Sequence, residues 1–271
     1  MSIKRLLFAL LMSILATSIQ AETINCTPIT ALPATITAQG IYCLTHKLGT
    51  NMTSGAAITI NANNVTIDLN GWKVDDGAAG NGTGAYGISS SYDNVTIKNG
   101  IVRGFYVGIY LAGSGDVVQD VLADTNYYVS LWFNGPGALA EHNQVVNSGN
   151  SSSSGSSTWG IYAGGDGTTI SNTIVSGVTA EGGGTAYGIV NNGVGGTVRN
   201  NVVSNAALPG SGTSYGISAG AGSAGSIVTN NSVNIFVTGI ALINGIYSFN
   251  TVNGCTTAFS GGTAGAANSN D

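Results

Sequence analysis

Three large aromatic residues recur at one place in successive segments of the chain. Tyr110, Trp132 and Tyr162 each follow an apolar residue that opens a short strand-like run, as Tyr110 follows Ile109. Neighbours in an extended strand point to opposite sides, so an inward Ile109 places Tyr110 outside. A row of exposed rings packs well against the C–H faces of sugars. The pattern therefore predicts a carbohydrate-binding face, with ring stacking that only stiffens this face as the alternative.

Because these rings face outward, removal of Trp132 is expected to change folding stability little.

Four more aromatic residues stand directly before a glycine instead. Strict alternation predicts that their side chains point into the core or the corner. They are Tyr86, Trp159, Tyr187 and Tyr215.

Arg103 and Asp124 are the candidates for catalysis, because they occupy similar places in adjacent segments just before the aromatic residues. A basic group and a carboxylate in contact are suited to proton abstraction from a uronic acid. The alternative is an exposed ion pair worth less than about 1 kcal/mol, which we favour. His142 is a further candidate acid or base, but a solvated surface histidine is the preferred interpretation.

The sequence predicts no metal site. Asp75, Asp76 and Asn81 fall in one loop and have the oxygen ligands that calcium takes, but a solvated loop is the preferred interpretation. The stretch 164–167 resembles a calcium-binding glycine-rich repeat but occurs once, which favours a turn.

A repeat must position these residues. A Gly-apolar or Ser-apolar pair recurs at intervals of 21–30 residues, and no stretch has sustained helical periodicity. One coil of a parallel β-helix fits the base period near 21 or 22, and it places Ile109 and Leu111 inward, as it does Leu131 and Phe133. The pairs are Gly87-Ile88, Gly108-Ile109, Ser130-Leu131, Gly160-Ile161, Gly188-Ile189, Gly216-Ile217 and Gly239-Ile240.

The longer intervals contain insertions at 148–158, 180–186 and 206–214, all just before the Gly-Ile pair. Insertions at one corner of a repeat form loops on one face, often the binding face. Two polar columns are also expected. One is a structural ladder of Asn99, Asp120, Asn143, Thr173, Asn201, Asn231 and Asn250. The other is an outward column of Lys98, Gln119, His142 and Asn172, with Glu141 beside it.

The chain divides into four expected segments. Residues 1–21 have a charged start at Lys4 and Arg5, a short apolar run and small residues, which predicts a secretory signal peptide. Residues 22–54 do not fit the repeat and are expected to form an N-terminal cap, closed by a Cys26–Cys43 disulfide. Residues 55–262 form the repeat, and residues 263–271 a C-terminal tail. Cys255 is left over and is interpreted as a small buried residue.

Composition limits the partners. Only 7% of the 271 residues are charged, and the formal net charge is -5. Loss of Lys4 and Arg5 with the signal peptide brings the net charge from -5 to about -7. Without a basic patch, nucleic acid is not an expected partner. The apolar run near the N-terminus is too short to span a bilayer. We expect a monomer that is secreted, periplasmic or held at the cell surface.

The Gly-Ile pairs, the repeated Asn-x-Val pattern and the run Asn64-Val65-Thr66-Ile67-Asp68-Leu69-Asn70-Gly71 resemble the right-handed parallel β-helix, or pectin lyase-like, superfamily. The resemblance covers residues 55–262. It implies an all-β, right-handed solenoid of about eight coils with an N-terminal cap. It also implies relatives such as pectate lyases, polygalacturonases, alginate epimerases and many exported proteins.

The active-site motifs of these enzymes do not carry over. Gly-His-Gly and Asp-Pro-His-Glu are absent, and the one Asp-Asp pair is Asp75-Asp76. We therefore expect a polysaccharide or cell-surface glycan to be bound on one lateral face without catalysis or cofactor. The alternative is a polysaccharide lyase or glycoside hydrolase with an active site of another design.

Overall fold

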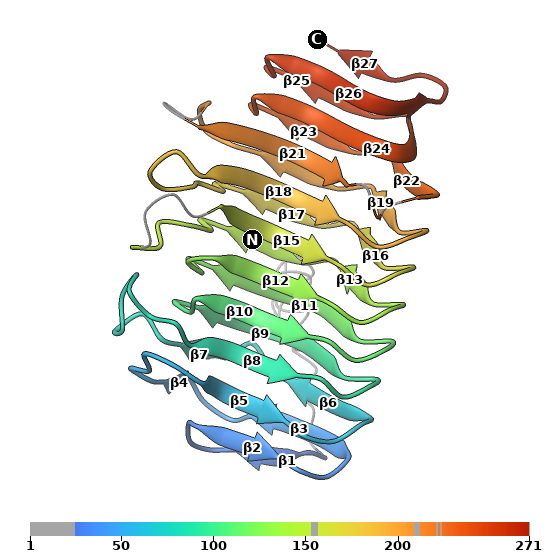
Figure 1. Ribbon diagram of the computed structural model, residues 1–271. Helices are drawn as coiled ribbons and strands as arrows, with labels where there is room; N and C mark the ends of the chain where they lie inside the picture. Colours follow the sequence, from blue (N-terminus) through green and yellow to red (C-terminus); the bar gives the residue numbers. More distant parts are fainter. Residues whose placement is uncertain (1–24, 153–156, 209–211, 221, 223, 271) are drawn as a thin grey trace, which may run out of the picture.

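The chain forms β-strands and no helix in the residues that the structure describes. A computed structural model describes residues 25–152, 157–208, 212–220, 222 and 224–270. The strands stack as three parallel ladders around one axis, so that each turn of chain is one coil of a parallel β-helix (Figure 1). The all-β solenoid expected from the sequence is confirmed. The predicted signal peptide, residues 1–21, lies outside the described residues.

We call the three ladders the first, second and third face, in their order along each coil. The first face contains β2 (Ala34–Ile36), β5 (Ala56–Ile60), β8 (Tyr86–Ser90), β10 (Val107–Leu111), β12 (Val129–Phe133), β15 (Thr158–Ala163), β18 (Thr185–Asn191), β21 (Thr213–Ala219), β24 (Thr238–Ser248) and β26 (Thr257–Ala264). Strands β24 and β26 continue round the corner into the second face.

The second face contains β1 (Thr27–Ile29), β3 (Gly40–Leu44), β6 (Val65–Asp68), β9 (Thr96–Arg103), β11 (Val117–Asp124), β13 (Leu139–Glu141), β16 (Thr169–Ser171), β19 (Thr197–Arg199) and β22 (Ser226–Thr229). Strands β9 and β11 run on into the third face. The third face also contains β4 (Leu48–Gly49), β7 (Lys73–Asp75), β14 (Gln144–Val146), β17 (Ile174–Ser176), β20 (Val202–Ser204), β23 (Ser232–Asn234), β25 (Thr251–Asn253) and β27 (Ser269–Asn270).

The core fills the space inside the three faces. Ile109 and Leu111 of β10 are fully buried, and so are Leu131 and Phe133 of β12, which confirms the predicted inward positions. Ile109 lies in register with Leu131 on the next coil. Like residues therefore stack on like residues at the spacing of paired strands, about 4.8 Å.

The strand ladder does not break at residue 54. Strand β2 pairs in parallel with β5, β3 with β6, and β4 with β7, so residues 34–49 form a coil of the same kind. The sequence pattern missed this coil because its first-face strand, Ala34–Ile36, has no Gly-Ile pair. Among the described residues before Ala34, the strand β1 covers part of the end by pairing with β3. An N-terminal cap can therefore be proposed for residues 25–33, but the repeat itself reaches back to Ala34.

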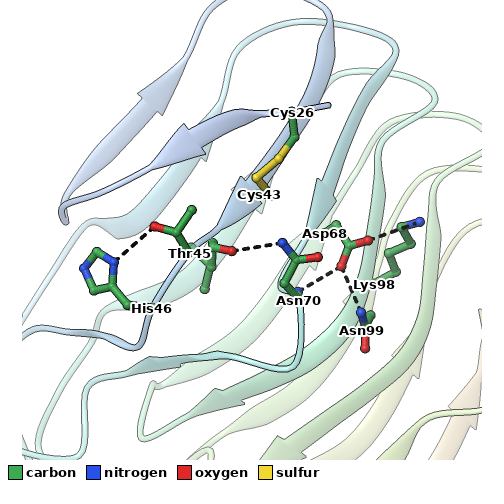
Figure 2. The surroundings of a disulfide bond; sticks show 9 residues. Cys26, Cys43, Thr45, His46, Asp68, Asn70, Lys98 and Asn99 are labelled. Carbon is green, nitrogen blue, oxygen red and sulfur yellow. Dashed lines mark hydrogen bonds and ion pairs between the residues drawn. A yellow bond between two sulfur atoms is a disulfide. The ribbon is translucent and has the colours of Figure 1, made fainter. Parts of the chain in front are cut away.

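A disulfide joins Cys26 and Cys43, with their Cα atoms 5.8 Å apart (Figure 2). Cys43 is a buried residue of β3, whereas Cys26 immediately precedes β1. The bond therefore holds the end strand β1 against the first complete coil.

Loss of this bond is expected to destabilise the N-terminal end. Closing a loop of this size restricts the unfolded chain, and we expect Cys26→Ser to cost about 2 kcal/mol. The measurement is the urea midpoint of the N-terminal transition for wild type and variant, with Cys255→Ser as the matched control. A midpoint unchanged by Cys26→Ser would contradict the stabilising role, and free Cys26 and Cys43 thiols in protein from the native compartment would contradict the pairing.

Two polar columns stand at the corner between the second and third faces, whereas a single ladder is expected there from the sequence. Asn99, Asp120 and His142 share a left-handed turn, with φ near +55°. Asparagine adopts this conformation readily, which explains its recurrence. The residue that follows each of them belongs to a separate, buried position. The predicted column therefore mixed Asn99 and Asp120 of the first column with Asn143 and its successors of the second.

The buried column is a ladder of amide side chains. The Nδ2 of Asn201 donates to Oδ1 of Asn231 at 3.0 Å, and the Nδ2 of Asn231 donates to Oδ1 of Asn250 at 3.0 Å. Such bonds satisfy polar groups that the coil turns would otherwise bury unpaired. Outside it, Lys98 stands in register with Gln119 and Glu141, so Glu141 and not His142 continues the outward polar column.

Cys255 has a comparable role at the corner between the third and first faces. Its half-buried Sγ accepts the backbone N–H of Phe236 at 3.4 Å. Two coils earlier in the chain, at the equivalent position, Oδ1 of Asn205 accepts the N–H of Val178 at 2.9 Å in the same way. The thiol thus replaces an amide oxygen rather than being a purely apolar filler. Burial raises the pKa of the Cys255 thiol.

Glycines stack at the turn from the first face to the second. Gly113, Gly135, Gly165 and Gly193 follow one another on successive coils, and a Cβ on each would collide with backbone atoms of the coil before it. Only glycine allows this approach, and the edge of the first face at this turn is therefore free of side chains at these positions.

Candidate functional site

Nine aromatic rings form one connected surface over the first face and its leading corner. We call this set the aromatic strip: Tyr86, Tyr106, Tyr110, Tyr128, Trp132, Trp159, Tyr162, Tyr187 and Tyr215. Every ring in it is partly exposed. No other set of ring contacts in the described residues joins more than two rings.

One row of the strip contains the three rings predicted from the sequence. Tyr110, Trp132 and Tyr162 lie in register on β10, β12 and β15. The ring centroids of Tyr110 and Trp132 are 5.2 Å apart, and those of Trp132 and Tyr162 are 5.8 Å apart, with edge-to-face geometry in both pairs. The structure therefore brings these three side chains together on the outside of the first face.

The second row corrects an expectation. Tyr86, Trp159, Tyr187 and Tyr215 do not point into the core but lie on the outside as well. Trp159 stacks on Tyr187 with centroids 5.7 Å apart, and Tyr187 on Tyr215 at 5.2 Å, with the ring planes within 9° of parallel. Their in-register strands β15, β18 and β21 set this spacing.

The glycine of each coil explains the outward direction of this row. In β8 the burial order is half-buried Tyr86, buried Gly87, buried Ile88, then half-buried Ser89. A Cβ on Gly87 would collide with the core side chains of Val102 and Phe105, so this position faces inward. Two consecutive inward positions break the alternation, and the residues on both sides of the Gly-Ile pair therefore face outward.

Tyr106 and Tyr128 were not predicted. Their rings stack at 4.5 Å and within 3° of parallel, and Tyr128 meets Trp159 edge to face at 5.0 Å. Tyr128 contacts both rows, through Trp132 and Trp159, and Tyr106 stacks on Tyr128. The sequence does contain a signal for them: each is the second residue of an aromatic doublet, Phe105-Tyr106 and Tyr127-Tyr128, at the same place in adjacent coils.

Trp132 is the packing centre of the strip. Its ring contacts Tyr110, Tyr128 and Tyr162. Its Nε1 is buried and has no hydrogen-bond partner within the described part of the chain. Because removal of Trp132 takes away three ring contacts, we now expect it to lower stability more than the sequence pattern alone indicates.

Three phenols of the strip, Tyr106, Tyr128 and Tyr187, have a raised pKa and are therefore neutral at pH 7. Burial raises the pKa of Tyr106 and of Tyr128, and the neighbouring tyrosines raise both further. Burial also raises the pKa of Tyr187, against a hydrogen bond to Thr185 that lowers it. Neutral phenols both donate and accept hydrogen bonds. The Tyr162 hydroxyl accepts a bond of this kind from Nδ2 of Asn192 at 3.3 Å.

Arg103 and Asp124 do meet, but on the third face and within a larger ion-pair network. The Nε of Arg103 lies 3.6 Å from Oδ2 of Asp124 and 3.9 Å from Oδ1 of Asp75. The Nζ of Lys73 lies 2.9 Å from Oδ2 of Asp75, and the Nζ of Lys47 lies 3.8 Å from the same oxygen. Burial raises the pKa of Asp75, but hydrogen bonds from Lys73 and the Gly77 N–H, together with the charges of Lys73 and Arg103, lower the pKa overall. The network links four successive coils, as a structural ion-pair ladder would.

The loop that begins at Asp75 and Asp76 is held by its own chain. Asp76 is fully buried, and its carboxylate accepts the N–H of Met52 at 2.8 Å and the hydroxyl of Thr83 at 3.3 Å. Burial raises the pKa of Asp76. Within the described ranges, no group of three or more His, Cys, Asp and Glu side chains could hold a metal ion. His142 is exposed.

The insertions stand at the corner where the third face meets the first, beside the aromatic strip. They join β14 to β15, β17 to β18 and β20 to β21, and they project on the same side as the loop from β7 to β8 (left in Figure 1). Parts of two of them, 153–156 and 209–211, lie outside the described residues. The strip thus has loops along one edge and the stacked glycines along the other.

Comparison with known proteins identifies the fold. No protein-family model matches the chain, and no curated protein matches it either. The Dettilon tailspike protein is similar in structure, with a TM-score of 0.62 and 18% identity over 91% of this chain and 54% of the tailspike. Pectate lyase Pel9A is similar with a TM-score of 0.53 and 14% identity, over 85% of this chain and 69% of the lyase.

The chain thus spans about half the length of the tailspike that it matches. At these identities the likeness shows the fold alone, and the fold is the right-handed parallel β-helix predicted from the sequence.

Proposed function

We propose that this protein binds an extended glycan along the aromatic strip and does not transform it chemically. The observation that carries the proposal is the connected surface of nine half-exposed rings that crosses six first-face strands, from Tyr86 on β8 to Tyr215 on β21. The two similar structures, a tailspike and a pectate lyase, are compatible with a carbohydrate ligand.

The dimensions and polarity of the strip support a linear ligand. Five steps of about 4.8 Å separate the strands at its two ends, which gives a track of about 24 Å. The first-face positions in register with Tyr110 are uncharged, and beyond the rings they are small or apolar, as with Ser89 and Val190. Ring faces would contact the C–H surfaces of the sugars, and the neutral phenols would bond their hydroxyls.

We also propose that the protein is exported. A disulfide between Cys26 and Cys43 is typical of an oxidising compartment. In the described residues, the structure has no helix that is both long and apolar enough to cross a bilayer.

A catalytic role is the second candidate, and only the contact between Arg103 and Asp124 favours it. Both groups are engaged in the ion-pair ladder, and two opposed carboxylates of the kind used for glycoside hydrolysis are not found among the rings of the strip. The release of unsaturated or reducing ends from a bound polysaccharide would reveal catalysis, and Arg103→Gln would then abolish it.

Trp132→Ala should weaken glycan binding by about 1–3 kcal/mol, the scale of one aromatic ring against a ligand. It should also lower the thermal midpoint, because three ring contacts are lost. The measurement is calorimetric affinity per folded molecule, at a temperature well below the midpoint of the variant. Trp72→Ala is the matched control, since Trp72 is 41% exposed and lies outside the strip.

The two variants separate binding from packing. We expect Trp72→Ala to keep the affinity of the wild type. If Trp132→Ala lowers the midpoint while affinity per folded molecule stays at the wild-type value, the rings serve packing and the proposal is wrong. Fluorescence gives a second readout, because two of the three tryptophans belong to the strip.

A further inference from the structure

A hollow lies between two of the insertions, at one end of the aromatic strip. It has a volume of about 500 Å³, within the usual range for small-molecule sites. Residues 179–182 and Gly184 form one side and residues 205–208 the other, with Ala186, Thr213 and Ser214 between them. It therefore opens between the coils that carry Tyr187 and Tyr215.

The lining of the hollow is mainly apolar. It includes Ala180, Ala186, Ala206 and Ala207, together with the larger Val178 and Leu208. The Asn205 amide is already bonded to the backbone of Val178 in both directions, at 2.9 and 3.2 Å. The hollow is thus suited to a compact apolar substituent.

Glu181 and Thr213 are two of the polar residues that line the hollow, beside Thr179, Asn205 and Ser214. Among the described lining residues, Glu181 is the one ionisable group, and it is exposed. Within the described residues the Glu181 carboxylate and the Thr213 hydroxyl have no hydrogen-bond partner. A carboxylate accepts hydrogen bonds and repels other anions. The hollow therefore favours a ligand with an N–H donor and disfavours an acidic sugar.

The hollow is continuous with the strip. The Tyr187 phenol interacts with the side chain of Thr185, and Thr185 is paired in register with Thr213, which lines the hollow. A sugar that stacks on Tyr187 would therefore have its substituents within reach of the hollow.

We propose that the hollow is a subsite for the acetamido group of an N-acetylated, uncharged sugar in the glycan held by the strip. The methyl group packs against the alanines, and the amide N–H donates to the Glu181 carboxylate. This inference rests on the proposed function and adds its substrate class: neutral glycans with N-acetylhexosamine units, rather than uronic acid polymers.

The test compares three hexasaccharides by titration calorimetry on the full chain: β-1,4-linked N-acetylglucosamine, β-1,4-linked glucose and α-1,4-linked galacturonic acid. Burial of one acetamido methyl predicts that wild type binds the N-acetylglucosamine hexamer about tenfold more tightly than the glucose hexamer. The galacturonic acid hexamer should bind most weakly.

Ala206→Trp fills the hollow from an exposed position and should abolish the preference without changing affinity for the glucose hexamer. Glu181→Gln should reduce the preference. Ala38→Trp, at an exposed alanine in the N-terminal coil, is the matched control and should leave all three affinities unchanged.

Each outcome decides between the two proposals. A preference that survives Ala206→Trp, no preference in wild type, or equal loss for both neutral hexamers overturns the subsite but leaves glycan binding by the strip. Tighter binding of the galacturonic acid hexamer overturns the substrate class. If wild type binds none of the three and no other extended glycan, the proposed function fails as well.

Discussion

Replacing Gly165 with alanine is expected to destabilise the folded protein by more than about 3 kcal/mol. Gly165 lies in the column of stacked glycines, and a Cβ there would collide with the carbonyl group of Gly135 and the nitrogen of Pro136. All of these are backbone atoms that the ladder holds in register. They cannot move aside as a flexible side chain would, so the coils themselves must separate.

Gly167 provides the matched control in the same turn. Its φ is +65°, and a Cβ there would meet nothing within 4 Å. Gly167→Ala therefore strains only its own backbone, at a cost of about 1 kcal/mol. Urea unfolding of both variants gives the comparison. If Gly165→Ala loses no more stability than Gly167→Ala, close packing of the coils at this turn does not limit the fold.

Asp116→Asn is expected to stabilise the protein by about 3 kcal/mol above pH 7 and to have little effect below pH 4. The Asp116 side chain is fully buried at the start of the second face. Its Oδ1 accepts the N–H of Val95 at 2.9 Å, and its Oδ2 has no partner in the described part of the chain. Burial raises the pKa of Asp116 to about 6, against backbone hydrogen bonds that lower it.

The sign follows from proton binding. Between pH 4 and 6 the folded protein holds a proton on Asp116 that the unfolded chain releases, so stability is lost as pH rises through about 6. Asparagine keeps the shape and the acceptor without the charge. Urea unfolding from pH 4 to 8 measures the difference, with Asp120→Asn as the control for removal of one exposed charge. Parallel pH profiles for wild type and Asp116→Asn would show that the ionised carboxylate carries no penalty.

The sequence predicted the architecture well because most coils repeat the same short pattern of residues. Gly108-Ile109 and its equivalents lie at one position of their coils. Parallel pairing in register then places equivalent residues of successive coils over one another. The first complete coil escaped notice for the same reason: Ala34–Ile36 forms its first-face strand without the Gly-Ile pair. Pairing with β5, rather than local sequence, places this strand in the fold.

The site was predicted only in its central row. Tyr110, Trp132 and Tyr162 follow the inward isoleucine or leucine, where alternation holds. Tyr187 precedes the glycine, and its direction depends on the inward place of Gly188, whose missing side chain leaves room for Val203 and for the next coil. The inward place of Gly188 is set by packing across the core, which the local sequence pattern does not reveal.

The two edges of the strip differ, and this has a consequence for long polymers. Loops stand along one edge, whereas short turns with a stacked glycine in each form the other edge. For the proposed ligand, the aromatic strip is an open surface and not a closed tunnel, so a glycan chain can bind to it from the side. Loading then needs no free chain end, so an internal stretch of a very long molecule is as accessible as its terminus. Several copies of the protein can occupy one strand of polymer at once, and their number is set by its length.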